Sequence, residues 1–199
     1  MERLETLKRK VAALYEAKNP NRAPWADWLY DQHVPYVAAQ AREIAQAHGA
    51  DPELAEVAGW LHDIADAKMD RHAAEHEEES LKMARQIMEE SGYSKEQIEL
   101  VVDDAIRLHS CYDGNRPASL EGQALAAADA LAHLKTDFYV FAARELAGEM
   151  TLEEFKQWVL KKIERDFVHK ICFDDIREAA RQDYEIIKNL FSRPPVTFR

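Results

Sequence analysis

The sequence contains little glycine and proline, only two cysteines and no long apolar run. Among 199 residues there are 6 glycines and 7 prolines, too few turn residues for a β-sandwich of this length, so an all-α fold is favoured. Cys111 and Cys172 form no disulfide framework and fit a reducing compartment. The absence of a run of about 18 apolar residues argues against a membrane-spanning helix. Residues 1–18 alternate charged and apolar side chains, unlike a signal peptide. We therefore expect a cytoplasmic protein that does not bind membranes.

Basic side chains are also in the minority. The 26 Lys and Arg residues face 37 Asp and Glu residues, which gives a net charge of −11 at pH 7. This balance argues against non-specific binding to DNA, RNA or an anionic membrane, because each of these needs a basic face. It leaves room for a local basic pocket that binds a small anion. With 47 % apolar and 32 % charged residues, the chain has the composition of a globular protein with one well-buried domain.

Apolar residues recur at helical spacing along almost the whole chain. The expected helices cover about residues 2–17, 25–48, 52–66, 72–91, 94–109, 120–147, 151–170 and 174–191. Their starts carry strong signals. Asp51 and Pro52 fit the N-cap and first position of a helix, while Ser94 and Thr151 open capping boxes. We predict an all-α, single-domain helical bundle.

Several titratable residues occupy apolar faces of these helices. They come from five expected helices and comprise His33, His62, Asp63, His76, His109 and Asp129. Burying an ionised carboxylate without a partner costs several kcal/mol, so such a group must be paired, protonated or bound to a metal. Imidazole and carboxylate together suit a divalent transition metal ion such as Mn, Fe, Co, Ni or Zn. Convergence on one or two such ions per chain would satisfy all six side chains.

Each of these residues also has an explanation without a metal. A single histidine on an apolar face is commonly a hydrogen-bonded core residue, and Asp129 can pair with His133 one turn further along. His76 lies within an acidic run, residues 75–79, and can be solvated there. The coincidence of six such residues, with His62 and Asp63 adjacent at a helix end, favours the metal site.

The order of these residues resembles the HD-domain superfamily of metal-dependent phosphohydrolases. The matching elements are His33, the Gly-Trp-Leu-His-Asp segment at residues 59–63 and the Ala-Ala-Asp segment at residues 127–129. The resemblance covers about residues 29–135. It implies that His33, His62, Asp63 and Asp129 hold one metal ion at the centre of a helical bundle.

The resemblance also implies further site residues. Some members hold a second metal ion with two more histidines, which here correspond to His76 and His109, and Asp63 would then bridge the ions. Asp66 resembles a position where some members keep an acid near the attacking water, so Asp63 and Asp66 are the expected catalytic residues. An exposed aspartate at a helix end is the alternative for Asp66. The candidate phosphate contacts, each otherwise a surface charge, are Lys68, Arg107 and Arg116.

By the same resemblance, the protein hydrolyses a phosphate ester or anhydride of a small molecule with a metal-activated water. The expected partner is a small anionic substrate, a nucleotide or another phosphate, and neither nucleic acid nor a membrane. Two alternatives stay open, since a fold alone does not determine function. One is a diiron oxygenase of the same superfamily, and the other is a non-catalytic, metal-stabilised module that senses a nucleotide or binds a partner.

The expected organisation has an HD-domain core at residues 25–140. Residues 1–24 form an N-terminal helix and linker that pack on this core. Residues 141–192 form C-terminal helices, whose apolar faces pack on the core or form a homodimer, and residues 193–199 form an extended tail.

Overall fold

The computed structural model describes residues 2–194, which form helices and connecting segments without a strand. In chain order the elements are α1 (Glu2–Glu16), α2 (Ala26–Trp28), η1 (Leu29–His33), α3 (Val34–Ala47), α4 (Pro52–Leu61), η2 (Ile64–Ala67), α5 (His76–Glu90), α6 (Lys95–Ile98), η3 (Glu99–Ile106), η4 (Tyr112–Gly114), α7 (Leu120–Lys135), α8 (Phe138–Leu146), α9 (Leu152–Arg165), η5 (Asp166–Lys170) and α10 (Asp174–Phe191). Elements η2 and η4 are 3-10 turns, and η1, η3 and η5 are π-helical. Most of the tail expected at residues 193–199 lies outside the described residues.

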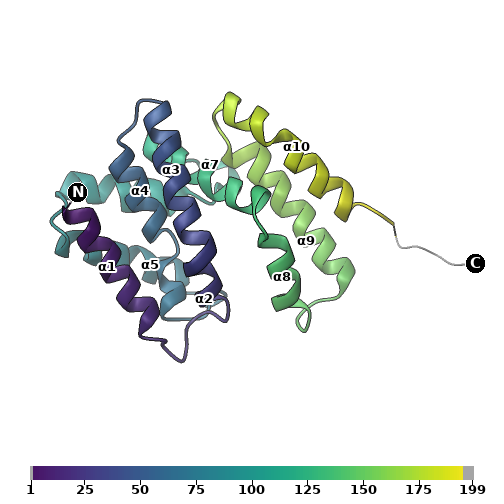
Figure 1. Cartoon of the computed structure of the whole chain (residues 1–199), viewed down its shortest axis with the longest axis horizontal. Helices are drawn as coiled ribbons and strands as arrows, with labels where there is room; N and C mark the ends of the chain where they lie inside the picture. Colours follow the sequence, from purple (N-terminus) through teal and green to yellow (C-terminus); the bar gives the residue numbers. More distant parts are fainter. Residues whose placement is uncertain (1, 195–199) are drawn as a thin grey trace, which may run out of the picture.

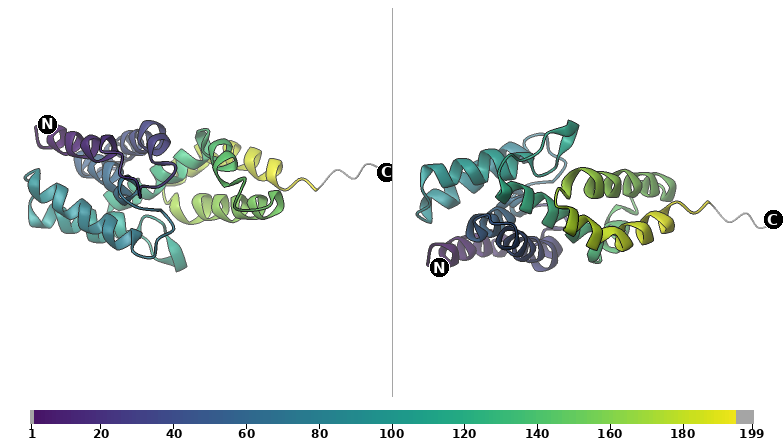
Figure 2. Two further views of the ribbon diagram at one scale, coloured as in Figure 1. Left: turned by 90° about the horizontal axis from the view of Figure 1, so that it is seen from below. Right: turned by 90° about the horizontal axis from the view of Figure 1, so that it is seen from above.

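The helices form two groups that meet at α7 (Figure 1). Helices α1 to α5 lie toward the N-terminal end and α8 to α10 toward the C-terminal end, as the two views of Figure 2 also show. Helix α3 packs against α4, and both pack against α7, while α9 and α10 pack against each other and α10 contacts α7. The predicted all-α bundle is confirmed. Within residues 2–194, no helix combines the length and apolarity needed to cross a membrane.

Helix α7 is the buried centre of the bundle. Every residue from Ala124 to Leu134 is buried, and most of them are alanines. Small side chains let neighbouring helices approach closely from several sides. Asp129 lies in the middle of this helix and is therefore placed deep in the molecule.

The helix expected at residues 120–147 is interrupted. Helix α7 ends at Lys135 and α8 begins at Phe138, because Thr136 leaves the helical conformation with φ −118° and ψ −177°. The Thr136 hydroxyl donates a hydrogen bond to the Ala132 carbonyl at 2.6 Å and accepts one from the Phe138 N–H at 3.3 Å. A side chain that satisfies the backbone in this way competes with helix continuation. The break brings Phe138 against His133, with 4.3 Å between ring centroids.

Three other expected helices differ near the titratable residues. The helix expected to reach residue 66 ends at Leu61, and Asp63 has the non-helical angles φ −129° and ψ 39° before η2 begins. The helix expected from residue 72 begins at His76. In the helix expected at residues 25–48, a π-helical segment ends at His33, and such segments are frequent at functional sites.

A close approach of α3 and α4 requires glycine at position 59. A Cβ atom there would lie 2.5 Å from the Ala38 Cα atom on the facing helix. Gly59 thus lets the two helices touch, one turn before His62.

Candidate metal centre

Three buried side chains from three elements converge at the centre of the bundle. They are His33 at the end of η1, His62 just after α4, and Asp129 on α7, and one ligand atom of each lies within 4.8 Å of the others. The His33 Nε2 atom is 3.1 Å from Asp129 Oδ1 and 3.4 Å from His62 Nε2. Among residues 2–194, this is the group whose geometry suits a metal ion.

The hydrogen bonds of these histidines fit metal binding. His62 Nδ1 lies 2.8 Å from the Gly59 carbonyl. An N–H at Nδ1 that donates to this oxygen leaves the lone pair on Nε2, as in many metal-binding histidines. His33 Nδ1 is buried and has no hydrogen-bond partner. Two imidazole nitrogens and a carboxylate oxygen that face one another suit a divalent transition metal ion, so the residues fit this group.

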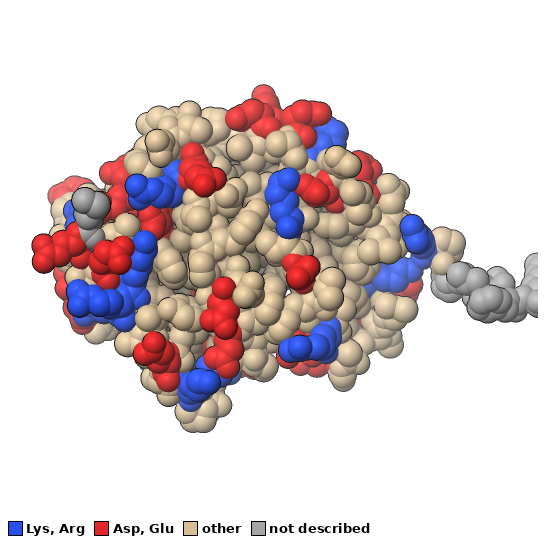
Figure 3. Space-filling model, in the orientation of Figure 1, with Lys and Arg blue, Asp and Glu red and all other residues tan. Residues whose placement is uncertain are grey.

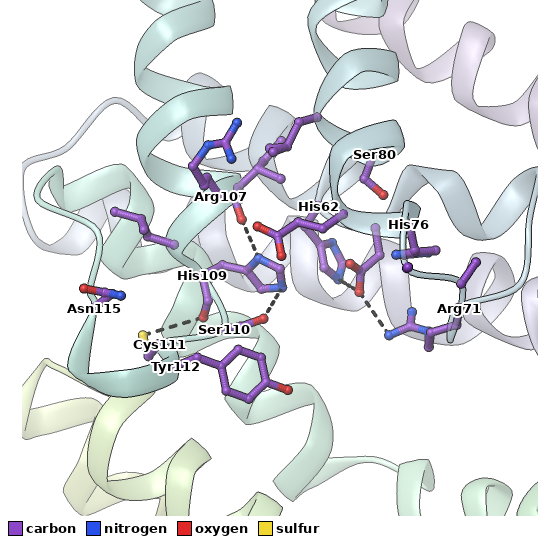
Figure 4. A pocket seen from close by; sticks show the side chains of 17 residues that line it. His62, Arg71, His76, Ser80, Arg107, His109, Ser110, Cys111, Tyr112 and Asn115 are labelled. Atoms are coloured by element: carbon purple, nitrogen blue, oxygen red, sulfur yellow. Dashed lines mark hydrogen bonds and ion pairs between the residues drawn. The ribbon is translucent and has the colours of Figure 1, made fainter.

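His109 and Asp63 border this three-residue group. The His109 Nδ1 atom lies 2.6 Å from the Ile106 carbonyl, and its ring meets that of His62 with 5.4 Å between centroids (Figure 4). Asp63 Oδ2 is 3.9 Å from His62 Nε2 and 3.1 Å from the Arg71 guanidinium. Their assignment as metal ligands stays a prediction, as does that of His76.

Asp66 and His76 are buried and bonded to each other, with His76 Nε2 2.9 Å from Asp66 Oδ1. This contradicts the two alternatives considered for them, an exposed aspartate and a solvated histidine. Arg71 also forms an ion pair with Asp66. Burial opposes ionisation of Asp63, but the Arg71 charge, together with the neighbouring histidines, holds the pKa of this carboxyl below its usual range. Arg71 is a site residue that the sequence analysis missed, because it lies in a polar loop without a helical face.

Further buried titratable side chains lie around Asp129. Lys170, 1 % exposed, forms an ion pair with Asp129 Oδ2. His133 Nε2 lies 3.3 Å from Asp129 Oδ1, and His133 Nδ1 lies 3.0 Å from Asp166 Oδ2. Burial opposes ionisation of Asp129, but His133 and Lys170 hold the pKa of this carboxyl well below its usual range. His133 and Lys170 were not assigned as ligands, and they hold Asp129 in place.

Two cavities meet at the candidate metal centre. The first has a volume of about 530 Å³ and includes His62 and His76 in its wall (Figure 4), and the second, of about 680 Å³, includes His33 and Asp129. Asp63 and His109 line both. The donor atoms therefore lie where a small molecule can reach them from two sides.

Of the three basic residues predicted to contact phosphate, one lines a cavity. Lys68 pairs with Glu79 at 2.6 Å and lines neither cavity, and Arg116 lines neither. Arg107 lines the first cavity, where it pairs with Glu78 at 2.9 Å. The second cavity is lined by five other cations, Arg71, Lys161, Lys162, Arg165 and Lys170. Three of them, Lys161, Lys162 and Arg165, lie on α9 in a segment of mixed charge, where the sequence offers no signal that separates them from surface residues.

The metal-free protein is expected to lose stability as the pH falls from 6.5 towards 4. Burial lowers the pKa of His109 to about 4 and that of His133 to about 3. In this window the unfolded chain binds protons that the folded chain does not, so each histidine lowers the free energy of unfolding by about 1.4 kcal/mol per pH unit. His76 is shifted the other way, since Asp66 raises its pKa despite burial. Its contribution is complete below pH 6.5 and adds no slope there.

Urea unfolding at pH 7, 6 and 5 with a chelator present would measure this effect. The His133→Gln variant should reduce the slope by the share of one histidine. A free energy of unfolding that stays constant between pH 7 and 5 would contradict the expectation.

Comparison with known families agrees with this geometry. The HD domain model matches residues 30–134, which is more than half of the chain and includes His33, His62, Asp63, His76, His109 and Asp129. Comparisons with curated proteins and with solved structures give no match. HD domains bind divalent metals, and most are metal-dependent hydrolases. From the family match and the buried His-His-Asp group together, we conclude that the chain belongs to the HD domain family.

Proposed function

We propose that the protein is a phosphohydrolase that cleaves a phosphate ester or anhydride of a small molecule, with a nucleotide as the first candidate. The observation that carries this proposal is the His33, His62 and Asp129 donor group beside two cavities with cationic walls. When bound, a divalent ion at these residues would lower the pKa of a water molecule and neutralise charge on phosphoryl oxygens.

The chain's own residues supply binding and orientation. Arg71 lines both cavities, and its contacts with Asp63 and Asp66 fix its guanidinium there. Asp66 is 1 % exposed and lines neither cavity. We therefore assign it a positioning role through Arg71 and His76 rather than contact with the attacking water. His76 lines the first cavity and is bonded to Asp66, so Asp66 would orient the imidazole that is predicted as a metal ligand.

The surroundings favour a small substrate. Trp25, Phe138 and Trp158 line the second cavity beside its cations and offer aromatic surface for a base. On the face shown in Figure 3, acidic and basic side chains are interspersed and form no extended basic patch. This distribution suits an enclosed small anion better than nucleic acid or a membrane surface.

Phosphate release from nucleotides and simple phosphate esters, measured with Mn²⁺, Fe²⁺, Co²⁺, Ni²⁺ or Zn²⁺, tests the proposal. We expect turnover that a chelator abolishes and that falls at least about 100-fold in the Asp63→Ala variant. The unfolding transition of this variant should lie in the same range as that of the wild type. Asp31→Ala, at an exposed position on η1, is the matched control and should retain turnover.

The other outcomes separate the alternatives. Oxygen consumption by the iron-loaded protein without phosphate release would favour the oxygenase. Stabilisation by a nucleotide without turnover in any metal would favour the binding module, and either result would overturn the proposal.

A further inference from the structure

The second cavity has one wall that comes from outside the matched HD region. Residues 30–134 contribute His33 and Asp129, and α9 contributes Lys161, Lys162 and Arg165 on the C-terminal side. The family resemblance therefore carries no role over to these three cations. Their placement in the same cavity as the donor group is a property of this chain.

These cations have few negative partners. Arg71 and Lys170, the other two cations of the cavity, are held by Asp63, Asp66 and Asp129. By contrast, Lys161 and Arg165 form no ion pair within residues 2–194, and Lys162 lies 3.8 Å from Asp166 Oδ2. Glu149 is the remaining carboxylate among the cavity's lining residues. A chain with a net charge of −11 thus gathers three cations with few negative partners along one wall of this cavity, where Lys161 is exposed and Lys162 and Arg165 are partly buried.

Arg165 is held at this wall by a contact across the cavity. Its guanidinium carbon lies 4.2 Å from the ring centroid of Tyr112, which lines both cavities. Stacking on an aromatic ring orients a guanidinium without neutralising its charge. The Arg165 Nε atom is buried and has no hydrogen-bond partner. Arg165 therefore has donor capacity that the protein itself does not use.

We propose that Lys161, Lys162 and Arg165 bind the outer phosphoryl groups of a linear phosphoanhydride, such as a nucleoside diphosphate or triphosphate. This inference rests on the proposed function and narrows its substrate class. A monoester has one phosphoryl group, which would occupy the donor group and leave the α9 cations uncompensated. An anhydride extends its negative charge over several phosphoryl groups and matches both walls of the cavity.

In the reaction, the oxygen of water forms a bond to one phosphorus atom and the bridging P–O bond breaks. The departing phosphate or pyrophosphate takes the electron pair of that bond. The proton that the water molecule loses goes to the solvent or to a phosphate oxygen. Cations on α9 would stabilise the charge that develops on this leaving group. The α9 cations would thus select the substrate. The donor group comes from other elements, namely η1, the residue that follows α4, and α7.

Calorimetric titration of the full-length protein, in the presence of a chelator, with inorganic tripolyphosphate and with orthophosphate tests the inference. We expect the wild-type protein to bind tripolyphosphate at least about 10-fold more tightly than orthophosphate. Arg165→Gln and Lys162→Met should each move this ratio towards one. Lys156→Met removes a charge from the same helix at a residue that does not line the cavity, so it should leave the ratio unchanged.

Two variants are used because Lys162 lies 3.8 Å from the buried Asp166, so that its replacement also removes an ion pair, whereas Arg165 forms no ion pair within residues 2–194. Unfolding curves should first establish that each variant is folded, and its affinity is then compared with that of the wild type. Equal affinity of the wild type for tripolyphosphate and orthophosphate would overturn the inference. So would an unchanged affinity ratio in both Arg165→Gln and Lys162→Met. Selective tripolyphosphate binding that depends on Arg165, with no phosphate release in any metal, would leave this anion site standing and overturn the hydrolase.

Discussion

Replacing His62 with glutamine is expected to weaken divalent-ion binding by at least about 100-fold. Losing only the hydrogen-bond partner of a metal ligand costs about 10- to 100-fold in affinity, and here a ligand itself is removed. Glutamine is similar in size, but its amide nitrogen has no lone pair for a metal. The His62 Nε2 atom lies 3.4 Å from His33 Nε2, so the variant takes away one of the two facing nitrogens.

Thermal or urea unfolding with and without Mn²⁺ measures this loss independently of turnover. At an ion concentration about 100 times the dissociation constant, the wild type gains about 2.7 kcal/mol, and a 100-fold weaker site gains only about 0.4 kcal/mol. His169→Gln, at an exposed position of η5, is the matched control and should keep the full gain. Equal stabilisation of His62→Gln and the wild type would place the ion elsewhere.

Replacing Lys170 with methionine is expected to destabilise the metal-free protein by about 3–5 kcal/mol. This is the range for breaking a buried ion pair, since the remaining charge keeps its desolvation cost without its partner. Lys170 and Asp129 are 1 % and 4 % exposed, so water cannot replace the ammonium. A divalent ion beside Asp129 would supply positive charge, and the loss should therefore be smaller when Mn²⁺ is present.

Urea unfolding of Lys170→Met, in chelator and in Mn²⁺, measures both values. Lys135→Met is the matched control, because Lys135 pairs with Asp183 at the surface, where both side chains are about a third exposed. Its expected loss is at most about 1 kcal/mol. If Lys170→Met lost the same stability in both conditions, Lys170 and the ion would not share the charge of Asp129.

The sequence predicts the helices and the donor group well because both depend on periodic patterns. His33, His62 and Asp129 each occupy an apolar helix face, so helical spacing alone indicates that they are buried. The ends of the helices are less predictable. The break at Thr136 depends on two side-chain hydrogen bonds, and threonine inside a helix can also form none.

The charged residues around the donor group were harder to predict. Arg71 lies in a loop, and its contacts with Asp63 and Asp66 depend on how that loop folds back. Glutamates on α5 pair with both Lys68 and Arg107, the predicted phosphate contacts, and of these two only Arg107 lines a cavity. One signal was present, because Lys170 lies among apolar neighbours in residues 167–173. A lysine in such a segment indicates either a turn or a buried ion pair, and here it forms the pair.

The alanine-rich helix α7 has a consequence for how this molecule can diversify. Six alanines between residues 124 and 132 are buried against neighbours. A larger side chain at these positions would push outward the elements packed around α7, and where α3 or α4 is displaced the imidazoles would separate from Asp129. The cations of α9 are less constrained, since they line a cavity and none of the three is fully buried. If α9 binds the anion as proposed, single substitutions on this helix would change which anion is bound while the donor atoms keep their positions.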